Sequence, residues 1–283
     1  MKKITFLALL VVCFYFSGLA QVKAPRLIVR VDDMGFAHSG NLAIEKTYKE
    51  GIATSVEIIV PSPWFPEAVK MLQAFPGIDV GIHIALTSEW DNVKYRPLTA
   101  AKSLVDDDGY FFPMIFPNKN YPGKALKENK FQIKDIEDEM RAQISLAMKK
   151  IPRISHISAH MGCYDISPEA KVIARKLAQE FKIDIDLQSH GVKYAGYNGP
   201  KNTAAEKVSA FIKMIESLKA GETYIFVDHP GLDDAELRAI HHIGYEDVAA
   251  DRQGVTDLLT NPEVKAAVKK AGVHLISYAQ VNQ

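Results

Sequence analysis

Short apolar runs rich in β-branched residues recur along the chain and alternate with segments of helical character. The runs are RLIVRV (26–31), TSVEIIV (54–60), DVGIHIAL (79–86), ISHISAH (154–160), KIDIDLQ (182–188), TYIFVDH (223–229) and VHLISYA (273–279). Strands that alternate with helices form βα units and therefore a parallel sheet. The pattern predicts an α/β protein with a TIM-like (β/α) barrel of about seven parallel strands, closed or nearly closed. An open doubly wound sheet is the alternative.

The segments between these runs carry helix signals. Residues 41–51 end in a glycine at the position of a C-cap, and residues 133–151 have apolar residues at helical spacing. Ser167 and Asn261 each precede Pro-Glu, the pattern of an N-cap with the first helical turn. No glycine-rich phosphate loop follows the first strand, which disfavours a Rossmann fold. No repeat or linker divides the chain, so we expect residues 21–283 to form a single domain.

One segment, residues 88–130, interrupts the alternation. A loop of this length in a compact domain is usually functional or disordered, and its proline, glycine and aromatic residues set it apart. Its aromatic residues are Trp90, Tyr95, Tyr110, Phe111, Phe112, Phe116 and Tyr121. They argue against disorder. We predict a long inserted loop that forms the wall or lid of a substrate cleft, or packs its own aromatic side chains against the barrel.

The first twenty residues have the layout of a secretory signal peptide. Two lysines precede an apolar run that is short for a membrane span, and small residues follow. We expect a signal peptide over residues 1–20, export to the periplasm or out of the cell, and no stable membrane span afterwards. Cleavage would remove Cys13 and leave Cys163 alone. A lone cysteine excludes an intramolecular disulfide, and a buried, inert thiol is favoured over a nucleophile.

The charge balance limits the partners of the chain. Lysine plus arginine equals aspartate plus glutamate at 34 each. No net field therefore attracts nucleic acid or an anionic membrane surface, and we expect no nucleic-acid partner. The sequence leaves a homodimer open.

Polar residues stand at or near the carboxyl ends of the predicted strands. They are Asp32 and Asp33 on the first strand, His83 on the third, His156 and His160 on the fourth, and Asp228 and His229 on the sixth. In a β/α barrel these ends converge on one face, which holds the active site. One aspartate and two histidines are a normal ligand set for a divalent metal. A bound cation would compensate the adjacent carboxylates of Asp32 and Asp33, with one as a ligand and the other free as a base.

These residues also have structural explanations. Asp33 could cap a helix, a lone histidine in a strand is often a packing residue, and His229 could stabilise the turn that follows it. The remaining histidines show no ligand pattern and are expected at the surface or in packing. They are His38, His190, His241, His242 and His274.

The motifs resemble those of the YdjC-like carbohydrate deacetylases in order and spacing, from about residue 26 to the end. VDDMGF (31–36) resembles the family's Asp-Asp-Phe-Gly opening, EGIATS (50–55) its Gly-x-x-Thr-Ser pattern, VGIHIALTSE (80–89) its Gly-x-His-x-x-Leu-Thr motif, SHISAHMG (155–162) its His-x-x-x-His motif, and VDHPG (227–231) its late His-Pro-Gly. The resemblance implies a β/α barrel of the glycoside hydrolase/deacetylase kind. It also implies metal-dependent removal of acetyl groups from N-acetylated amino sugars or oligosaccharides.

The resemblance assigns a role to each matching position. Asp33, His83 and His160 would be the ligands of one divalent metal ion. We expect Zn²⁺, while the ligand set also allows Mg²⁺ or another divalent ion. Asp32 would be the general base and His229 the general acid. Three further residues would touch the substrate or support the ligands from behind: His156, Arg30 and Trp90.

The chain departs from the family pattern at three places. Arg30 and its successor stand where the family commonly has Asn-Ala, and Ser158 with its successor stands where it often has Asp-Ser. Residues 161–163 follow the last ligand, where the family often has further histidines. Because Ser158 lacks the carboxylate that could orient a ligand histidine, we expect the groups behind the ligands to differ.

Other functions stay open on the sequence alone. Another metal-dependent amidase or esterase could use the same barrel. A glycosidase would need two carboxylates that face each other across the substrate, whereas the paired acids here are adjacent. A catalytically inactive, exported carbohydrate-binding protein could also retain the fold, and Arg30 and the altered 158–163 stretch leave this open. Against it, all five positions assigned to the metal and to proton transfer are intact.

Overall fold

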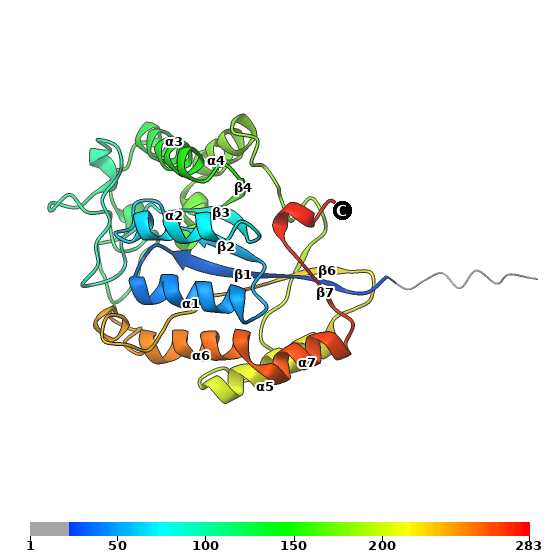
Figure 1. The fold of residues 1–283 in the computed structure, drawn as a ribbon. Helices are drawn as coiled ribbons and strands as arrows, with labels where there is room; N and C mark the ends of the chain where they lie inside the picture. The colour runs from blue at the N-terminus through cyan, green and yellow to red at the C-terminus, as the bar shows by residue number, and fades with distance from the viewer. Residues whose placement is uncertain (1–22) are drawn as a thin grey trace, which may run out of the picture.

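The computed structural model describes residues 23–283, so the predicted signal peptide and Cys13 lie outside the described residues. Parallel strands form one curled sheet with helices packed around it (Figure 1). The strands are β1 (Arg26–Met34), β2 (Ser55–Ile58), β3 (Asp79–Ile84), β4 (Ile154–Ala159), β5 (Lys193–Tyr194), β6 (Thr223–Asp228) and β7 (His274–Ile276). The predicted α/β fold with seven parallel strands is confirmed.

The sheet is an open barrel rather than a closed one. Its hydrogen-bonded order is β4-β3-β2-β1-β6-β5, so β4 and β5 stand at the two ends. β1 is the central strand. One of its edges pairs with β6, while the first half of the other edge pairs with β7 and the second half with β2. The half-closed sheet brings the carboxyl ends of β1, β3, β4 and β6 to one side of the molecule.

The strand predicted over residues 182–188 is wrong. This segment is irregular, and β5 begins later, at Lys193, with only two residues. Its alternating pattern has another cause, because Ile185 and Leu187 pack into the small apolar cluster around Ile28 inside the barrel. Alternation shows that one face of a segment is buried, but it does not show that a neighbouring strand is available for pairing.

Helices cover the outside of the sheet in the described part of the chain (Figure 1). They are α1 (His38–Lys49), α2 (Phe65–Ala74), α3 (Ile133–Lys150), α4 (Pro168–Glu180), α5 (Ala204–Ser217), α6 (Val248–Thr260) and α7 (Pro262–Lys270). The two predicted N-caps are confirmed, because Ser167 accepts a hydrogen bond from the Ala170 amide and Asn261 from the Glu263 amide. None of the helices in residues 23–283 combines the length and the apolar character needed to cross a bilayer.

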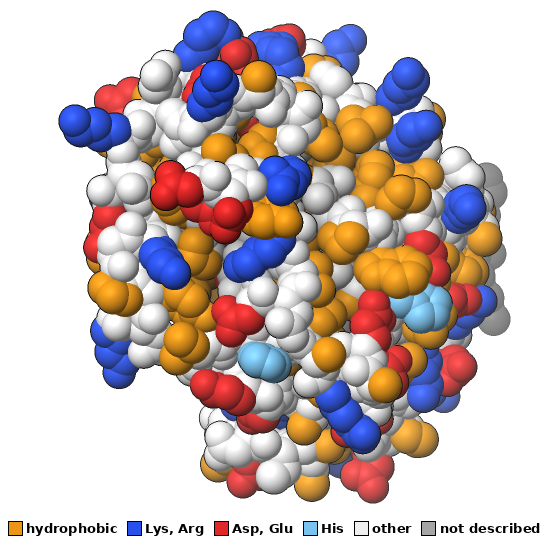
Figure 2. All heavy atoms as spheres, turned by 90° about the vertical axis from the view of Figure 1, so that its left-hand side faces the viewer, with side chains coloured by type: hydrophobic (Ala, Val, Ile, Leu, Met, Phe, Trp, Pro, Cys, Tyr) orange, Lys and Arg blue, Asp and Glu red, His pale blue; other side chains and the backbone are white. Residues whose placement is uncertain are grey.

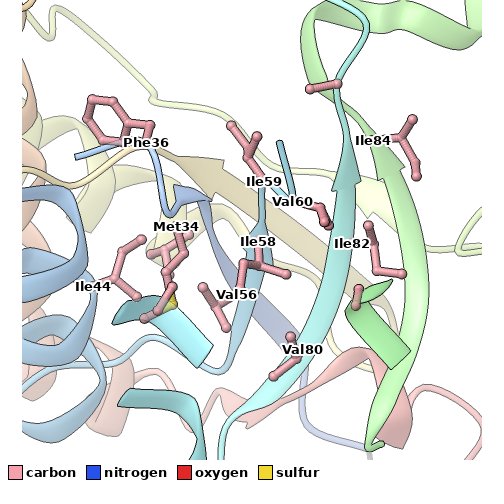
Figure 3. Close-up of a cluster of buried hydrophobic side chains, with 14 of the residues drawn as sticks. Met34, Phe36, Ile44, Val56, Ile58, Ile59, Val60, Val80, Ile82 and Ile84 are labelled. Atoms are coloured by element: carbon pink, nitrogen blue, oxygen red, sulfur yellow. The ribbon is translucent and has the colours of Figure 1, made fainter. Parts of the chain in front are cut away.

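The main apolar core lies between the sheet and the helices. Figure 3 shows Val56 and Ile58 of β2 pointing toward Met34 and toward Ile44 of α1. Successive residues of a strand point to opposite faces, so Glu57, between Val56 and Ile58, points into the barrel. By the same alternation His83 of β3 lies inside, between the outward-pointing Ile82 and Ile84. The apolar pattern of the strands thus sends specific polar side chains to the inner face.

The inserted loop of residues 88–130 packs its own aromatic side chains, since Trp90, Tyr95 and Phe111 are almost fully buried. A buried carboxylate also anchors it. Glu139 of α3 accepts hydrogen bonds from the amides of Leu98 and Thr99 and from the Thr99 hydroxyl. The loop lies on the side of the molecule where the strands end (Figure 1). It is therefore placed to contribute to a cleft at that face.

Candidate active site

The carboxyl ends of β1, β3, β4 and β6 surround a cavity of about 400 Å³. Six of the predicted site residues line it: Asp32, Asp33, His83, Trp90, His160 and His229. Glu89, Met161, His242, Tyr245 and Arg252 complete the wall, together with Ala159. Figure 2 views the molecule from the side to which the strands point, where histidine, acidic and hydrophobic side chains lie close together. Residues far apart in the sequence thus meet in one cavity, as predicted from their positions at the carboxyl ends of parallel strands.

A distortion at the end of β1 turns both adjacent carboxylates into the cavity. The register between β1 and β2 shifts between Val31 and Met34. Asp33 has a φ of 70°, in the left-handed region that few residues other than glycine adopt. In a regular strand Asp32 and Asp33 would point to opposite faces. The irregularity at this point turns one of the two carboxylates, so that both face the cavity. Bulges next to active sites commonly redirect a side chain in this way.

Asp33, His83 and His160 form a buried group that could hold a metal ion, with one ligand atom from each residue, all within 4.8 Å of one another. Oδ1 of Asp33 lies 3.6 Å from Nε2 of His83 and 3.3 Å from Nδ1 of His160. This oxygen is buried and has no hydrogen-bond partner among the described residues. One carboxylate oxygen and two imidazole nitrogens are a suitable donor set for a divalent metal. The residues present therefore fit such an ion.

Each candidate ligand histidine is fixed through its other ring nitrogen. Nε2 of His160 lies 3.0 Å from the Glu89 carboxylate, which leaves Nδ1 facing Asp33. Nδ1 of His83 lies 2.6 Å from the Ser158 hydroxyl, which leaves Nε2 facing the two aspartates. Metal-binding histidines almost always donate their second ring N–H to such a partner, which fixes the tautomer and the orientation of the ring.

The charges around this group favour a cation at its centre. Burial acts to raise the pKa of Asp33, but His229, Arg252 and His160 outweigh it and hold that pKa well below its usual range. Burial lowers the pKa of His83 to about 4, so its imidazole is neutral, which is the form that binds a metal. Burial also acts to lower the pKa of His160, yet Glu89 and Asp33 raise it to about 10. The His160 imidazole between these two carboxylates is therefore protonated without a metal, and a divalent ion would take the place of its Nδ1 proton, which faces Asp33.

Asp32 supplies a second carboxylate beside this group. Its Oδ2 accepts a hydrogen bond of 2.8 Å from Arg30 and lies 3.7 Å from Nε2 of His83. Its Oδ1 is buried without a hydrogen-bond partner among the described residues. Arg30 also donates to the hydroxyl of Tyr278 and does not line the cavity. Asp32 therefore keeps Oδ1 free to accept a proton, while the hydrogen bond from Arg30 fixes Oδ2.

His229 follows β6 and is the most accessible of the predicted catalytic residues, with 39% of its side chain exposed. Its Nε2 lies 4.0 Å from Asp33 Oδ2, and its Nδ1 lies 3.7 Å from Asp228 Oδ1. Burial acts to lower the pKa of His229, but the charge of Asp33 and hydrogen bonding to the Asp228 carboxylate outweigh it and raise that pKa. Asp228 also accepts a hydrogen bond of 2.5 Å from the hydroxyl of Tyr197. A protonated imidazole at the cavity wall is thereby favoured.

His156 lies behind the candidate ligands rather than in the cavity. It is fully buried, its Nε2 lies 2.5 Å from Oε1 of Glu57, and its ring stacks on Tyr278 at 3.5 Å between centroids. Of the two predicted roles for His156, support from behind agrees with this position, and contact with a substrate in the cavity does not.

Three further predictions concern single side chains. Cys163 is fully buried, as predicted, and its thiol donates to the Ile84 carbonyl at 3.2 Å. Burial raises its pKa, which agrees with the predicted inert thiol. Trp90 lines the cavity, although only 2% of the residue is exposed. His242, expected at the surface or in packing, also lines the cavity, with its ring 5.5 Å from that of Trp90.

Sequence reasoning missed three charged residues of the site. Arg252 of α6 donates to Oδ2 of Asp33 at 2.8 Å, and its guanidinium lies 4.5 Å from the ring centroid of Phe36. Glu89 holds His160, and Glu57 accepts a hydrogen bond from Ser158. A usable signal existed for two of them, because Glu57 interrupts an apolar strand and Glu89 directly follows a motif at a strand end. Nothing in the sequence of α6 marks Arg252.

The chain is similar to known proteins both in sequence and in fold. The sequence pattern of the family described as YdjC-like protein matches residues 26–270. A carbohydrate deacetylase from Enterococcus faecalis is 25% identical over 270 residues, covering 89% of this chain and 97% of its own length. Carbohydrate deacetylase 1 from Listeria innocua is 26% identical over 260 residues, covering 89% and 98%. A crystal structure from E. faecalis, described as a candidate cellobiose-phosphate cleavage protein, has the same fold, with a TM-score of 0.70, 21% identity and coverage of 92% and 99%.

Proposed function

The chain belongs to the YdjC-like family, and from this premise we propose that it is a metal-dependent carbohydrate deacetylase. Its reaction would be the hydrolysis of the acetamide of N-acetylated amino sugars or oligosaccharides. The observation that carries the proposal is the unpartnered Oδ1 of Asp33, which faces two oriented imidazoles beside the free oxygen of Asp32. The names of relatives that match nearly the whole chain support the choice of substrate class.

Asp33, His83 and His160 would hold the ion through Oδ1, Nε2 and Nδ1. We propose Zn²⁺, because imidazole nitrogens are good ligands for zinc, whereas magnesium prefers a site made only of oxygen ligands. When bound, such an ion polarises the acetamide carbonyl and lowers the pKa of a coordinated water toward about 7. Glu89 and Ser158 keep the two imidazoles in the required tautomers. Arg252 occupies Oδ2 of Asp33 and leaves Oδ1 for the ion.

Asp32 would act as the general base. Its free Oδ1 would accept a proton from the water that attacks the acetamide carbonyl, while Arg30 holds Oδ2 in place. His229 would act as the general acid. Its imidazolium, kept charged by Asp33 and Asp228, would donate a proton to the departing sugar amine. This transfer matters because an amide nitrogen leaves poorly unless it is protonated.

The geometry also bears on the other hypotheses. A retaining glycosidase needs two carboxyl groups about 5 Å apart on either side of the scissile bond. Here Asp32 and Asp33 lie side by side around the same imidazole of His83, which favours hydrolysis of an acyl group. An amidase or esterase with another substrate would use the same residues, and an inactive binding protein would have no need for the oriented tautomers.

We further propose that residues 1–20 are removed on export and that residues 21–283 form the mature, single-domain enzyme in the periplasm or outside the cell. The basic start, short apolar run and small residues of the amino terminus support this proposal. Cell fractionation and amino-terminal sequencing of the exported protein would test it. A cytoplasmic protein that retains residues 1–20 would contradict it.

The first experiment on function is a test of metal dependence. We expect residues 21–283 to bind about one divalent ion per chain by elemental analysis. They should also release acetate from N-acetylglucosamine oligomers in a reaction that a chelator stops and Zn²⁺ restores. Metal binding without acetate release would redirect the proposal to other acyl substrates. A protein that binds no metal even after Zn²⁺ is added would refute the ligand assignment and favour the binding protein.

A further inference from the structure

A chain of buried hydrogen bonds runs from the candidate ligand His83 to a carboxylate on a different strand. Nδ1 of His83 lies 2.6 Å from the hydroxyl of Ser158, and this hydroxyl lies 2.5 Å from Oε2 of Glu57. The other oxygen of Glu57, Oε1, lies 2.5 Å from Nε2 of His156. Glu57 and His156 are fully buried, and neither lines the cavity. The mechanism described above gives Glu57 no role and places His156 only behind the candidate ligands.

We infer that Glu57, acting through Ser158, is a positioning residue that fixes the imidazole of His83 for metal binding. The inference deepens the proposed function and rests on it for the ligand role of His83. It also accounts for Ser158, which brings no carboxylate of its own to His83. β2 supplies the carboxylate instead, and the serine hydroxyl spans the distance.

The direction of each hydrogen bond follows from the chemistry of the three groups. An ionised carboxylate only accepts hydrogen bonds, so the single hydroxyl proton of Ser158 goes to Glu57. The Ser158 oxygen must then accept from Nδ1–H of His83. The neutral ring carries only this one proton, so Nε2 has a free lone pair, and Nε2 is the atom that faces Asp33. Glu57 thus selects one of the two tautomers of His83.

The surroundings keep Glu57 ionised. Burial acts to raise the pKa of Glu57, but His156, Arg30 and His83 outweigh it and lower that pKa to about 2. The charge of Arg30 acts on two acids, because Arg30 also donates a hydrogen bond to Asp32. A buried carboxylate with such partners costs less free energy than an isolated one, and it is strongly destabilising to remove only one partner.

Gly81 provides the space that this arrangement needs. A Cβ atom at position 81 would collide with Nε2 of His156 and with both carboxylate oxygens of Glu57. Gly81 lies on β3, where its Cα is paired with that of His156 on β4 and with that of Glu57 on β2. Both neighbouring strands therefore direct a large polar side chain over the same residue. The glycine allows Glu57 to reach across β3 to Ser158.

The test measures the Zn²⁺ affinity of purified, folded variants by titration against a competing chelator. We expect Ser158→Ala and Glu57→Gln each to weaken Zn²⁺ binding by about 10–100-fold, the usual effect of a lost partner behind a metal-binding histidine. Combining Glu57→Gln with Ser158→Asp places a carboxylate directly beside Nδ1 of His83. This double variant should bind Zn²⁺ more tightly than Glu57→Gln alone.

Glu139→Gln is the matched control. Glu139 is also a fully buried carboxylate that accepts several hydrogen bonds, but it anchors the inserted loop and does not contact a candidate ligand. Its replacement should lower stability and leave Zn²⁺ affinity unchanged. A merely structural Glu57 would behave in the same way as Glu139. Circular dichroism of each variant confirms that affinity is measured on folded protein.

Nitrogen-15 NMR of the imidazoles in the metal-free protein provides a second, independent readout. His83 should be protonated on Nδ1 in the wild type and should lose this preference in Ser158→Ala. If Glu57→Gln fails to fold, Ser158→Ala, which removes a single hydroxyl, decides the question. Unchanged Zn²⁺ affinity and an unchanged tautomer in folded Ser158→Ala would overturn the inference. A wild type that binds Zn²⁺ but releases no acetate would refute the deacetylase proposal alone, because the affinities still test Glu57.

Discussion

The two halves of the sheet differ in regularity and in the kind of site residue that each contributes. In the half that we call regular, strands β1 to β4 contain between four and nine residues each. In the other half β6 contains six residues, but β5 and β7 contain only two and three. The regular half supplies Asp33, His83 and His160, which are almost fully buried. His229 follows β6 in the other half and has 39% of its side chain exposed.

The difference matches what each group must do. A metal site requires ligand atoms held within a fraction of an ångström, which buried side chains with fixed hydrogen bonds provide. A proton donor must reach a leaving group that enters and departs, so it needs access from the cavity. Asp228 and Tyr197 hold His229 from one side only. In the proposed mechanism the regular half would bind the metal ion, and His229 of the irregular half would reach the substrate.

The largest effect should come from the regular half. His83→Ala removes an imidazole nitrogen from the candidate metal site, so we expect stoichiometric Zn²⁺ binding to be lost. Deacetylation should fall by roughly 10³-fold or more, since a bound metal contributes several kcal/mol to the transition state. Elemental analysis and acetate release measure the two losses. His242→Ala is the matched control, because His242 lines the same cavity without facing Asp33 and should leave the metal content unchanged.

Replacement of the proton-transfer residues should separate catalysis from metal binding. We expect Asp32→Asn and His229→Ala each to slow acetate release by about 10²–10⁴-fold, the usual contribution of one general acid or base. Both variants should retain one metal ion per chain, because neither residue is a proposed ligand. Loss of metal in Asp32→Asn would show that Asp32, rather than Asp33, is the ligand.

A smaller effect should appear in the dependence of the rate on pH. The acid must be protonated, so activity should fall as the pH rises through the pKa of His229, which its neighbouring carboxylates raise. Asp228→Asn removes one of these charges and lowers the pKa of His229. The alkaline limb of the kcat profile should therefore move to lower pH, with a loss of only a few-fold at its plateau. Tyr197→Phe leaves the charge of Asp228 in place, so the alkaline limb of the kcat profile should shift less than in Asp228→Asn.

Much of the regular half could be predicted from the sequence. The apolar runs of β1 to β4 lie close to their predicted positions. Both faces of β1 to β3 are buried almost throughout, and β4 alternates between buried and half-buried residues. The polar residues at the strand ends converge because parallel strands end on the same side. The strand ends therefore predicted that these polar residues meet, and the resemblance to the YdjC-like family singled out Asp33, His83 and His160 among them.

The rest depends on contacts that the local sequence does not encode. The side chain of Arg252 donates a hydrogen bond to that of Asp33, which lies 219 residues away in the sequence. The apolar pattern of α6 predicts only that one face of this helix is buried, and not which polar group that face meets. The left-handed backbone of Asp33 depends on the register shift between β1 and β2. The alternating residues 182–188 read as a strand, but they fill the interior at the open seam of the barrel.

Helix termini, in contrast, were predictable in both halves of the molecule. Ser167 caps α4, next to the regular half, and Asn261 caps α7, whose chain leads into β7. Each side chain satisfies an amide that has no partner within its helix, and this interaction involves only residues close in sequence. We therefore expect Ser167→Ala and Asn261→Ala to cost a similar amount, about 1 kcal/mol of unfolding free energy each.

Urea denaturation measures this smallest effect, and it sharpens the contrast between the halves. If the described domain unfolds as one unit, Ser167→Ala and Asn261→Ala should lower the urea midpoint of unfolding equally. Both should leave the Zn²⁺ affinity of the native protein unchanged. The difference between the halves would then lie in local order and hydrogen bonding, and not in separate stability. If Asn261→Ala instead produced a second, earlier transition while Ser167→Ala did not, α7 and β7 would be an independently unfolding unit. His229 would in that case stand beside a part of the barrel that opens without disturbing the metal ligands.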